Sequence, residues 1–187
     1  AIIDKDKNLQ VAGGMLSNYF TAWAKSITAQ SDTDSFLVLP FKEEVAHGGN
    51  FHLSILDEIH VMPDDSMYKV AVSSQGARSQ PIICMITTAG TSEESFCNRK
   101  FSFAKSVCRG LIKDDEFLPI LYYSDEKEFN DDWNDEDLWI RVNPMYGLGK
   151  KISYMNRMYK NAVNDPLFEN TFKQLDINMV TEGEFAA

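Results

Sequence analysis

Two adjacent carboxylates, Asp57 and Glu58, directly follow a short apolar run that begins at Phe51. The run is rich in strand-favouring residues and closes in polar ones, which predicts a buried strand over 51–56. In an open α/β sheet, ligands bind at the carboxyl ends of the strands. There, one carboxylate could hold Mg²⁺, often through water, and the next could polarise a water that attacks a phosphate. A strand that simply runs into an acidic turn is the alternative interpretation.

A second apolar run, from Pro81 to Thr87, contains no charged residue and leads into the sequence Thr-Thr-Ala-Gly. The residues between the two runs predict a helix over Met67 to Ala77. Two strands joined by one helix form a βαβ unit, so we expect the strands to be parallel and adjacent. The hydroxyls of Thr87 and Thr88 should then emerge at the same edge as the two carboxylates. A hydrophobic strand ending in Asp-Glu is also the Walker B pattern of ATPases that carry a catalytic glutamate.

The composition limits the classes of function. The 187 residues include 18 Lys and Arg against 28 Asp and Glu, a formal net charge of −10. Because a surface this acidic cannot bind nucleic acid by general electrostatics, any DNA contact must be local. The cysteines are odd in number and lack C-x-x-C spacing, which fits reduced thiols in a cytoplasm rather than disulfides or a zinc site. No leader pattern opens the chain, and since it begins with Ala we expect a fragment.

The rest of the first two thirds of the chain predicts alternating short strands and helices. The predicted elements are a strand at 1–3, an amphipathic helix from about 9 to 27, a strand at 36–39, a helix from a capping box at Thr91 and Glu94 to about 111, and a strand at 117–123. Near the end of the last helix, Lys105, Arg109 and Lys113 share one face. A solvated face that complements the helix dipole is favoured there over a DNA-binding surface.

The composition changes near residue 124. From Asp114 to Asp137 there are eleven acidic residues against the single base Lys127, which indicates a solvated hinge. Beyond the hinge, apolar spacing predicts a short helix ending at 143–144 and further helices over 151–162 and 167–175. We therefore predict a partial core over residues 1–124 and a mostly helical appendage over 125–187. Trp133 and Trp139 are expected to provide the apolar contact of this appendage.

Other motifs add no second site. No G-x-x-x-x-G-K-[ST] loop occurs in the sequence, so a phosphate cradle must lie outside this chain or the protein is not an ATPase. His47, His52 and His60 have no partners spaced as metal ligands. His52 fits a strand position, and His60 fits an ordinary polar residue after a strand. The sequence also supports no Ser–His or Cys–His nucleophile arrangement.

The run FHLSILDEIHVMPDDSMYKVAVSSQGARSQPIICMITTAG, residues 51–90, closely resembles the ATPase domain of the large terminase subunit of tailed bacteriophages. The resemblance rests on the LDEIH box, the MPD turn, the GAR-x-QP segment and the ITTAG end of the second strand. Downstream, DDWNDEDLW, the Asn143–Pro144 pair and SYMNRMYKNAVNDPLFENTFKQLDIN are similar to the region linking that domain to the nuclease. The resemblance covers nearly the whole chain and is weakest before residue 40.

The resemblance implies a partial P-loop NTPase-like fold of the recA (ASCE) type, with a parallel sheet flanked by helices. Residues 1–124 would hold the Walker B and coupling motifs, and 125–187 a helical linker or lid. The implied site residues are Asp57 for magnesium and nucleotide, Glu58 as catalytic glutamate, Thr87 and Thr88 as the coupling motif that senses the γ-phosphate, Gly90 at the nucleotide, and Arg78 as a phosphate- or subunit-contacting arginine.

The resemblance further implies ATP and Mg²⁺ as cofactors, and a motor that couples ATP hydrolysis to translocation of double-stranded DNA into a procapsid. The implied partners are viral DNA, the portal protein, the small terminase subunit and further copies in a ring, with no membrane. The implied location is the host cell cytoplasm, transiently on the procapsid. The Walker A loop would precede Ala1 and the nuclease would follow Ala187, so this segment alone should bind ATP poorly and cut no DNA.

Two other classes stay open. DExH helicases also carry the DEIH sequence, although their next strand typically ends in Ser-Ala-Thr and their downstream arginine motifs are missing here. A non-catalytic interaction module on a nucleotide-binding-like fold would explain the lack of a Walker A loop. The flanking reading frame distinguishes the three classes, because a terminase adds a nuclease, a helicase adds a second recA-like domain, and a binding module adds neither.

Overall fold

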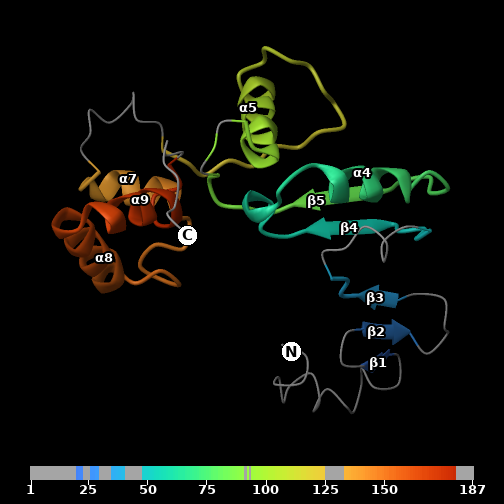
Figure 1. Cartoon of the computed structure of the whole chain (residues 1–187), viewed down its shortest axis with the longest axis horizontal. Helices are drawn as coiled ribbons and strands as arrows, with labels where there is room; N and C mark the ends of the chain where they lie inside the picture. The colour runs from blue at the N-terminus through green and yellow to red at the C-terminus, as the bar shows by residue number, and fades with distance from the viewer. Residues whose placement is uncertain are drawn as a thin grey trace.

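The computed structural model describes residues 20–22, 26–29, 35–40, 48–90, 92, 94–124 and 133–179. Its strands are β1 (Phe20–Ala22), β2 (Ser26–Ala29), β3 (Ser35–Leu37), β4 (Leu53–Leu56) and β5 (Ile82–Met85). Its helices are the 3-10 turn η2 (Ile59–Val61) and the α-helices α4 (Ser66–Ser73), α5 (Phe96–Cys108), α7 (Glu136–Val142), α8 (Ile152–Asn164) and α9 (Pro166–Leu175). Figure 1 shows β1–β3 apart from β4 and β5, with α7, α8 and α9 grouped together. The predicted α/β class is confirmed.

Strands β4 and β5 are parallel neighbours, as the two apolar runs predict. Leu53 pairs with Ile82, and Leu56 pairs with Met85. The pairing continues past the strands, since the Ile86 N–H donates to the Leu56 carbonyl at 2.9 Å. The single crossover between the strands contains α4, so both strands run in the same direction and end at the same edge.

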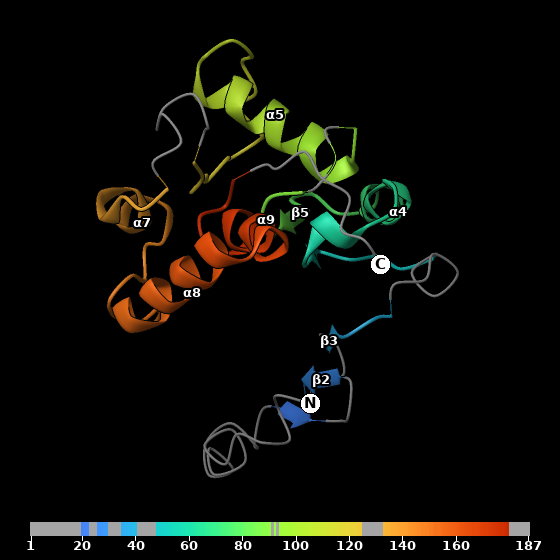
Figure 2. The ribbon, with the colours of Figure 1, turned by 60° about the vertical axis from the view of Figure 1, so that its left-hand side comes forward.

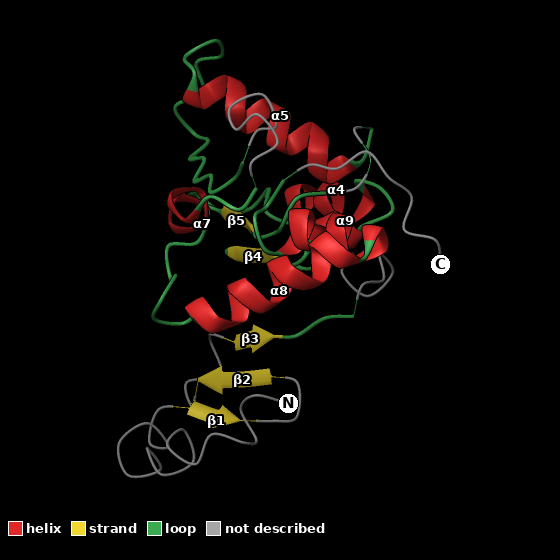
Figure 3. Ribbon diagram, turned by 90° about the vertical axis from the view of Figure 1, so that its left-hand side faces the viewer, coloured by secondary structure: helices red, strands yellow, loops and turns green. Residues whose placement is uncertain are grey.

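Helices α4 and α5 cover one face of this sheet, and in Figure 3 α5 lies above the two strands. Leu56 and Met85 point to that side and pack with Ile59 of η2 and with Phe96 and Cys97 of α5. Alternate residues of a strand point to opposite faces. The side chains of Leu53, Ile55, Ile82 and Ile86, on the other face, therefore remain 47–54% exposed in the structure.

Helix α4 is shorter than the predicted 67–77. The hydroxyls of Ser73 and Ser74 both donate to the Val70 carbonyl, at 3.0 and 2.8 Å. Serine side chains that bond back to the helix in this way compete with the backbone ladder and favour its end.

Helix α5 begins later than the predicted capping box implies. Its N-cap is Ser95, whose hydroxyl accepts from the Asn98 N–H at 3.1 Å. Thr91 lies outside the described residues, and Glu94 precedes the cap. The helix ends at Cys108, and Gly110 follows with φ of +71°, a conformation that glycine adopts without steric cost.

The predicted helix over 9–27 is wrong where the structure describes it. Strands β1 and β2 lie there as an antiparallel pair, with Thr21 opposite Thr28, and β2 pairs in turn with β3. β-Branched residues such as Thr21, Ile27 and Thr28 favour strands, and pairing with β3 decides the outcome. Strand β3 corresponds to the predicted strand at 36–39, whereas the predicted strand at 1–3 lies outside the described residues.

The predicted strand at 117–123 is also wrong, because that segment packs on α5 instead of pairing. Phe117 and Tyr123 make edge-on ring contacts with Phe103 and Phe101, at centroid distances of 5.1 and 4.9 Å. Leu118, on the other side of the segment, is 84% exposed. Ser124, which follows it, forms an isolated parallel bridge with Met179.

Helices α7, α8 and α9 enclose a second hydrophobic core. Its buried residues are Leu138, Trp139, Val142, Met155, Ala162, Phe172, Ile177 and Met179. Trp133 packs against this core, and its ring lies 5.0 Å from Tyr159 and 5.7 Å from Phe172. The three predicted helices and the contact of the two tryptophans are thus present. The boundary near residue 124 stays a prediction.

Local sequence explains where these helices start. Asp135 caps α7 by accepting from the Asp137 N–H at 2.9 Å. Asp165 caps α9 in the same manner, and Pro166 occupies its first turn, where a missing N–H costs nothing.

No helix in the described parts of the chain is long and apolar enough to cross a membrane.

Candidate functional site

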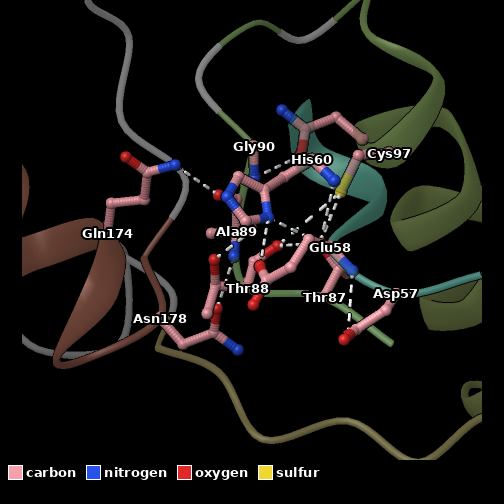
Figure 4. A network of polar contacts seen from close by, with 11 residues as sticks. Asp57, Glu58, His60, Thr87, Thr88, Ala89, Gly90, Cys97, Gln174 and Asn178 are labelled. Carbon is pink, nitrogen blue, oxygen red and sulfur yellow. Dashed lines mark hydrogen bonds and ion pairs between the residues drawn. The ribbon is translucent and has the colours of Figure 1, made fainter. Parts of the chain in front are cut away.

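The carboxyl ends of β4 and β5 bring the predicted polar residues together. Asp57 and Glu58 follow β4, and Thr87 and Thr88 follow β5 after one further residue. Figure 4 shows the side chains of Glu58, Thr87 and Thr88 gathered around His60. The geometric prediction that these residues share one sheet edge is confirmed, while their chemical roles stay predictions.

His60 is the centre of this cluster. Its backbone N–H donates to the Thr87 hydroxyl at 3.0 Å. Its ring Nδ1 lies 3.2 Å from Oε2 of Glu58, 3.2 Å from Oγ1 of Thr87 and 3.4 Å from Oγ1 of Thr88. These contacts of His60 could not be predicted from the sequence, because a histidine two residues beyond Glu58 resembles any polar residue after a strand.

The 3-10 turn η2 places His60 there. Ile59 is 3% exposed and anchors the turn in the apolar cluster under β4. Its N–H donates to the Ile86 carbonyl at 3.2 Å, so the turn continues the edge of β5. The ring of the next residue, His60, consequently faces the end of β5.

Glu58 itself has a left-handed backbone, with φ of 55° and ψ of 46°. Its N–H donates to Oδ1 of Asp57 at 3.0 Å, and its side chain remains 60% exposed. A non-glycine residue in this conformation costs about 1–3 kcal/mol, and such strain is concentrated at functional sites. The sharp turn between β4 and η2 therefore presents the carboxylate to solvent beside His60.

The two threonines are held on their other side by α5. The Thr87 hydroxyl donates to the Thr88 carbonyl at 2.8 Å and lies 3.6 Å from Sγ of Cys97. Cys97 is 2% exposed, and burial raises the pKa of its thiol. Because the group stays a neutral thiol at pH 7, Cys97 packs under the threonines rather than acting as a nucleophile.

The residue after the threonines is bound by the C-terminal helical part of the chain. The Ala89 N–H donates to Oδ1 of Asn178 at 2.6 Å, and Nε2 of Gln174 donates to the Ala89 carbonyl at 2.7 Å. Gln174, near the end of α9, is 3% exposed. Both backbone polar groups of Ala89 are thus bound by residues about 90 positions later in the sequence. In Figure 2, α9 lies near β5.

Gly90 has a packing reason to be glycine. A Cβ at this position would lie 3.0 Å from Oδ1 of Asn98, and the Gly90 N–H donates to that same oxygen at 3.3 Å. Asn98 is buried and also donates to the Ser92 carbonyl at 2.7 Å. The predicted role of Gly90 in nucleotide binding stays a prediction, since its amide already has a protein partner.

Arg78 does not join the other candidates. Its Nε and Nη2 donate to the Asn50 carbonyl at 3.0 and 2.6 Å. Asn50 and Arg78 precede β4 and β5, so this contact lies at the amino ends of the parallel strands, opposite the candidate site. Arg78 therefore lies away from Glu58 in this arrangement, and its role as a phosphate- or subunit-contacting arginine stays a prediction.

A magnesium site here would depend on Asp57. Among the residues that the structure describes, no three His, Cys, Asp or Glu side chains gather as a metal cluster. Mg²⁺ typically keeps several waters and uses one or two carboxylates together with substrate phosphates. Asp57 is exposed, and only its Oδ1 accepts a hydrogen bond within the described part of the chain. A single accessible carboxylate of this kind fits magnesium bound with a nucleotide.

A known protein family matches part of the chain. Residues 22–106 match the family model described as the ATPase domain of the terminase large subunit. Over these residues the chain is similar to terminase large subunits. The matched range contains Asp57, Glu58, His60, Thr87, Thr88 and Gly90. Among the classes that the sequence left open, the match favours the terminase over the DExH helicase.

Individual relatives agree with this assignment. The chain is 26% identical over 145 residues to the terminase large subunit of Enterobacteria phage HK97, covering 76% of this chain and 27% of that protein. It is 30% identical over 132 residues to protein YmfN of Escherichia coli strain K12, covering 71% of this chain and 28% of the relative. The chain therefore spans only about a quarter of the length of these relatives.

A solved structure shows the same fold. The crystal structure of the HK97 bacteriophage large terminase superposes with a TM-score of 0.75 and 22% sequence identity. The match covers 92% of this chain and 36% of the HK97 chain. It thus extends well beyond the range of the family model and into the C-terminal helices.

Proposed function

We propose that this chain is the ATP-hydrolysing motor segment of a terminase large subunit, with the γ-phosphate end of ATP at the carboxyl edge of β4 and β5. One observation carries the proposal: the Glu58 carboxylate and the Thr87 and Thr88 hydroxyls converge on one nitrogen of His60. This places an exposed carboxylate beside two hydroxyls at the edge where ligands of parallel sheets bind.

Asp57 and Glu58 divide the chemistry between them. Asp57 would bind Mg²⁺ directly or through water, and the ion, when bound, neutralises charge on the β- and γ-phosphates. Glu58 would orient the attacking water and take its proton. Its carboxylate suits this role because it is 60% exposed, so water reaches it, and because its contact with His60 Nδ1 at 3.2 Å can hold its orientation.

Thr87 and Thr88 would sense whether the γ-phosphate is present. A hydroxyl that turns toward the phosphate must change its contact with His60, and the two threonines precede Ala89 directly. Since Gln174 and Asn178 bind both backbone groups of Ala89, a shift of this segment would move the end of α9 with it. The C-terminal helices would thereby respond to hydrolysis.

In the whole protein, this response would drive translocation of double-stranded DNA into a procapsid. The core would be a recA-type sheet over residues 1–124 with a linker over 125–187, working in a homo-oligomeric ring with the portal protein and the small terminase subunit in the host cytoplasm. Because this chain carries a net charge of −10, any DNA contact that it makes would be confined to local basic surfaces.

The test compares substitutions in the full-length protein. Glu58→Gln should preserve binding of ATP and Mg²⁺ but lower turnover at least 100-fold, because general-base help is worth about 10²–10⁴-fold. Asp57→Ala should instead weaken Mg²⁺-dependent nucleotide binding. Thr88→Ala should leave some hydrolysis while uncoupling it from DNA packaging. Glu116→Gln, which makes the same charge change on an exposed loop, is the matched control. Parent turnover in Glu58→Gln would refute the catalytic assignment.

A further inference from the structure

One nitrogen atom of His60 faces more partners than it can bind at once. Nδ1 lies within 3.4 Å of the Glu58 carboxylate and of the hydroxyls of Thr87 and Thr88. A neutral imidazole nitrogen carries either one hydrogen or one lone pair. His60 Nδ1 can therefore donate to one acceptor or accept from one donor, and these contacts compete.

The hydrogen-bond pattern of the threonines shows which contacts compete. The Thr87 hydroxyl hydrogen is used on the Thr88 carbonyl at 2.8 Å, so its oxygen meets Nδ1 only as an acceptor. The Glu58 carboxylate is likewise an acceptor. The Thr88 hydroxyl can donate to Nδ1 when the ring hydrogen is on Nε2. Holding Glu58 and accepting from Thr88 are thus alternative states of one ring.

The ring of His60 makes these contacts without belonging to the apolar core. Its neighbours Ile59 and Met62 are buried in the cluster under β4, whereas the His60 side chain is 15% exposed. Within the described residues, the polar contacts of the ring are those with Glu58, Thr87 and Thr88.

We propose that His60 is a positioning residue that connects the Glu58 carboxylate to the coupling threonine Thr88. With the hydrogen on Nδ1, the ring holds Glu58 in the orientation that serves the attacking water. With the hydrogen on Nε2, the ring accepts from Thr88 and releases Glu58. The proposal rests on the proposed function, and it adds that the base is aligned only while the Thr88 hydroxyl is turned away from His60.

Two amide substitutions test this proposal in the full-length protein. The amide group of Asn branches from Cγ, the same number of bonds from the backbone as Nδ1, whereas that of Gln corresponds to Nε2. His60→Asn should therefore keep a polar group between Glu58 and Thr88 and retain kcat for ATP hydrolysis within about threefold. His60→Gln should lose this contact and lower kcat at least tenfold, because small misplacements of catalytic groups cost up to about 10²-fold. KM for ATP should change less than twofold in both variants.

Controls separate alignment from folding. His52→Gln makes the same change on the adjoining strand segment, where the described contacts of His52 use its backbone carbonyl, and should leave kcat unchanged. As a second measurement, the effect of Thr88→Val on kcat should be smaller in size in the His60→Gln background than in the parent, because contacting residues that act together are not additive. Should His60→Gln fold poorly, the same cycle with His60→Asn should retain the full effect of Thr88→Val.

The outcomes distinguish this proposal from the proposed function. Loss of turnover in Glu58→Gln together with parent kcat in His60→Gln would refute the positioning role alone. Equal losses in His60→Asn and His60→Gln would also refute it, because the contact through Nδ1 would then be unimportant. Parent turnover in Glu58→Gln would refute the proposed function and this proposal with it.

Discussion

The left-handed backbone at Glu58 predicts that Glu58→Gly is more stable than Glu58→Ala, the reverse of the usual order of alanine and glycine. With φ of 55°, any Cβ crowds the following carbonyl at a cost of about 1–2 kcal/mol, which glycine avoids. Glu58→Ala and Glu58→Gly both lose the carboxylate and its contact with His60, so those losses cancel in a comparison of the two. Glycine also loses more conformational entropy than alanine on folding, which reduces this advantage of glycine by about 0.5–1 kcal/mol. The glycine variant should therefore be more stable than the alanine variant by about 0.5–1 kcal/mol.

Chemical unfolding followed by circular dichroism measures this difference. The matched control is Ala71→Gly, which makes the alanine-to-glycine change inside α4 at a residue with ordinary helical geometry. There glycine should destabilise by at least about 1 kcal/mol, because the helix propensity falls and the buried methyl group of Ala71 is lost. A Glu58→Ala variant at least as stable as Glu58→Gly would refute the reasoning, because it would mean that the backbone at Glu58 carries no strain in solution.

Three further substitutions test the packing of the C-terminal part. Gln174→Ala should lower the free energy of unfolding in urea by about 1–3 kcal/mol, because it leaves the buried Ala89 carbonyl without its donor. A loss below about 0.5 kcal/mol would contradict that contact. Phe172→Ala should cost about 3–5 kcal/mol, since Phe172 is 0% exposed at the centre of the helical core. A urea unfolding midpoint that falls no further than for a substitution at an exposed position would contradict this. Burial and the hydrogen bond to Glu136 raise the pKa of Tyr146 to about 12. The unfolded chain then loses this proton first, near pH 10, so stability should fall between pH 10 and 12, and Tyr146→Phe should flatten that fall in thermal melts.

The edge of the β4–β5 sheet could be predicted because its determinants are local in sequence. Short apolar runs define both strands, and the βαβ rule then requires parallel strands that end at one edge. Asp57, Glu58, Thr87 and Thr88 follow these runs directly, so their meeting follows from topology alone. The caps at Asp135 and Asp165 are equally local, and the helices they begin lie where the sequence predicts them.

Features that depend on distant partners could not be predicted in the same way. The contacts of His60 exist because η2 turns its ring toward β5, and nothing at residues 59–61 encodes that direction. The binding of Ala89 by Gln174 joins residues 85 positions apart. The apolar spacing of the residues in β1 and β2 also fits a helical period, and only pairing with β3 decides between strand and helix.

The most direct test of the nucleotide site is a structure of the full-length Glu58→Gln variant with ATP and Mg²⁺, because slow hydrolysis should keep the nucleotide intact. The account predicts the γ-phosphate at the carboxyl edge of β4 and β5, with the Thr88 hydroxyl and the residue 58 side chain both facing it and the Mg²⁺ ion on Asp57 or its ordered water. ATP bound at the amino ends of the strands, near Arg78, or anywhere else away from Asp57 would contradict the account.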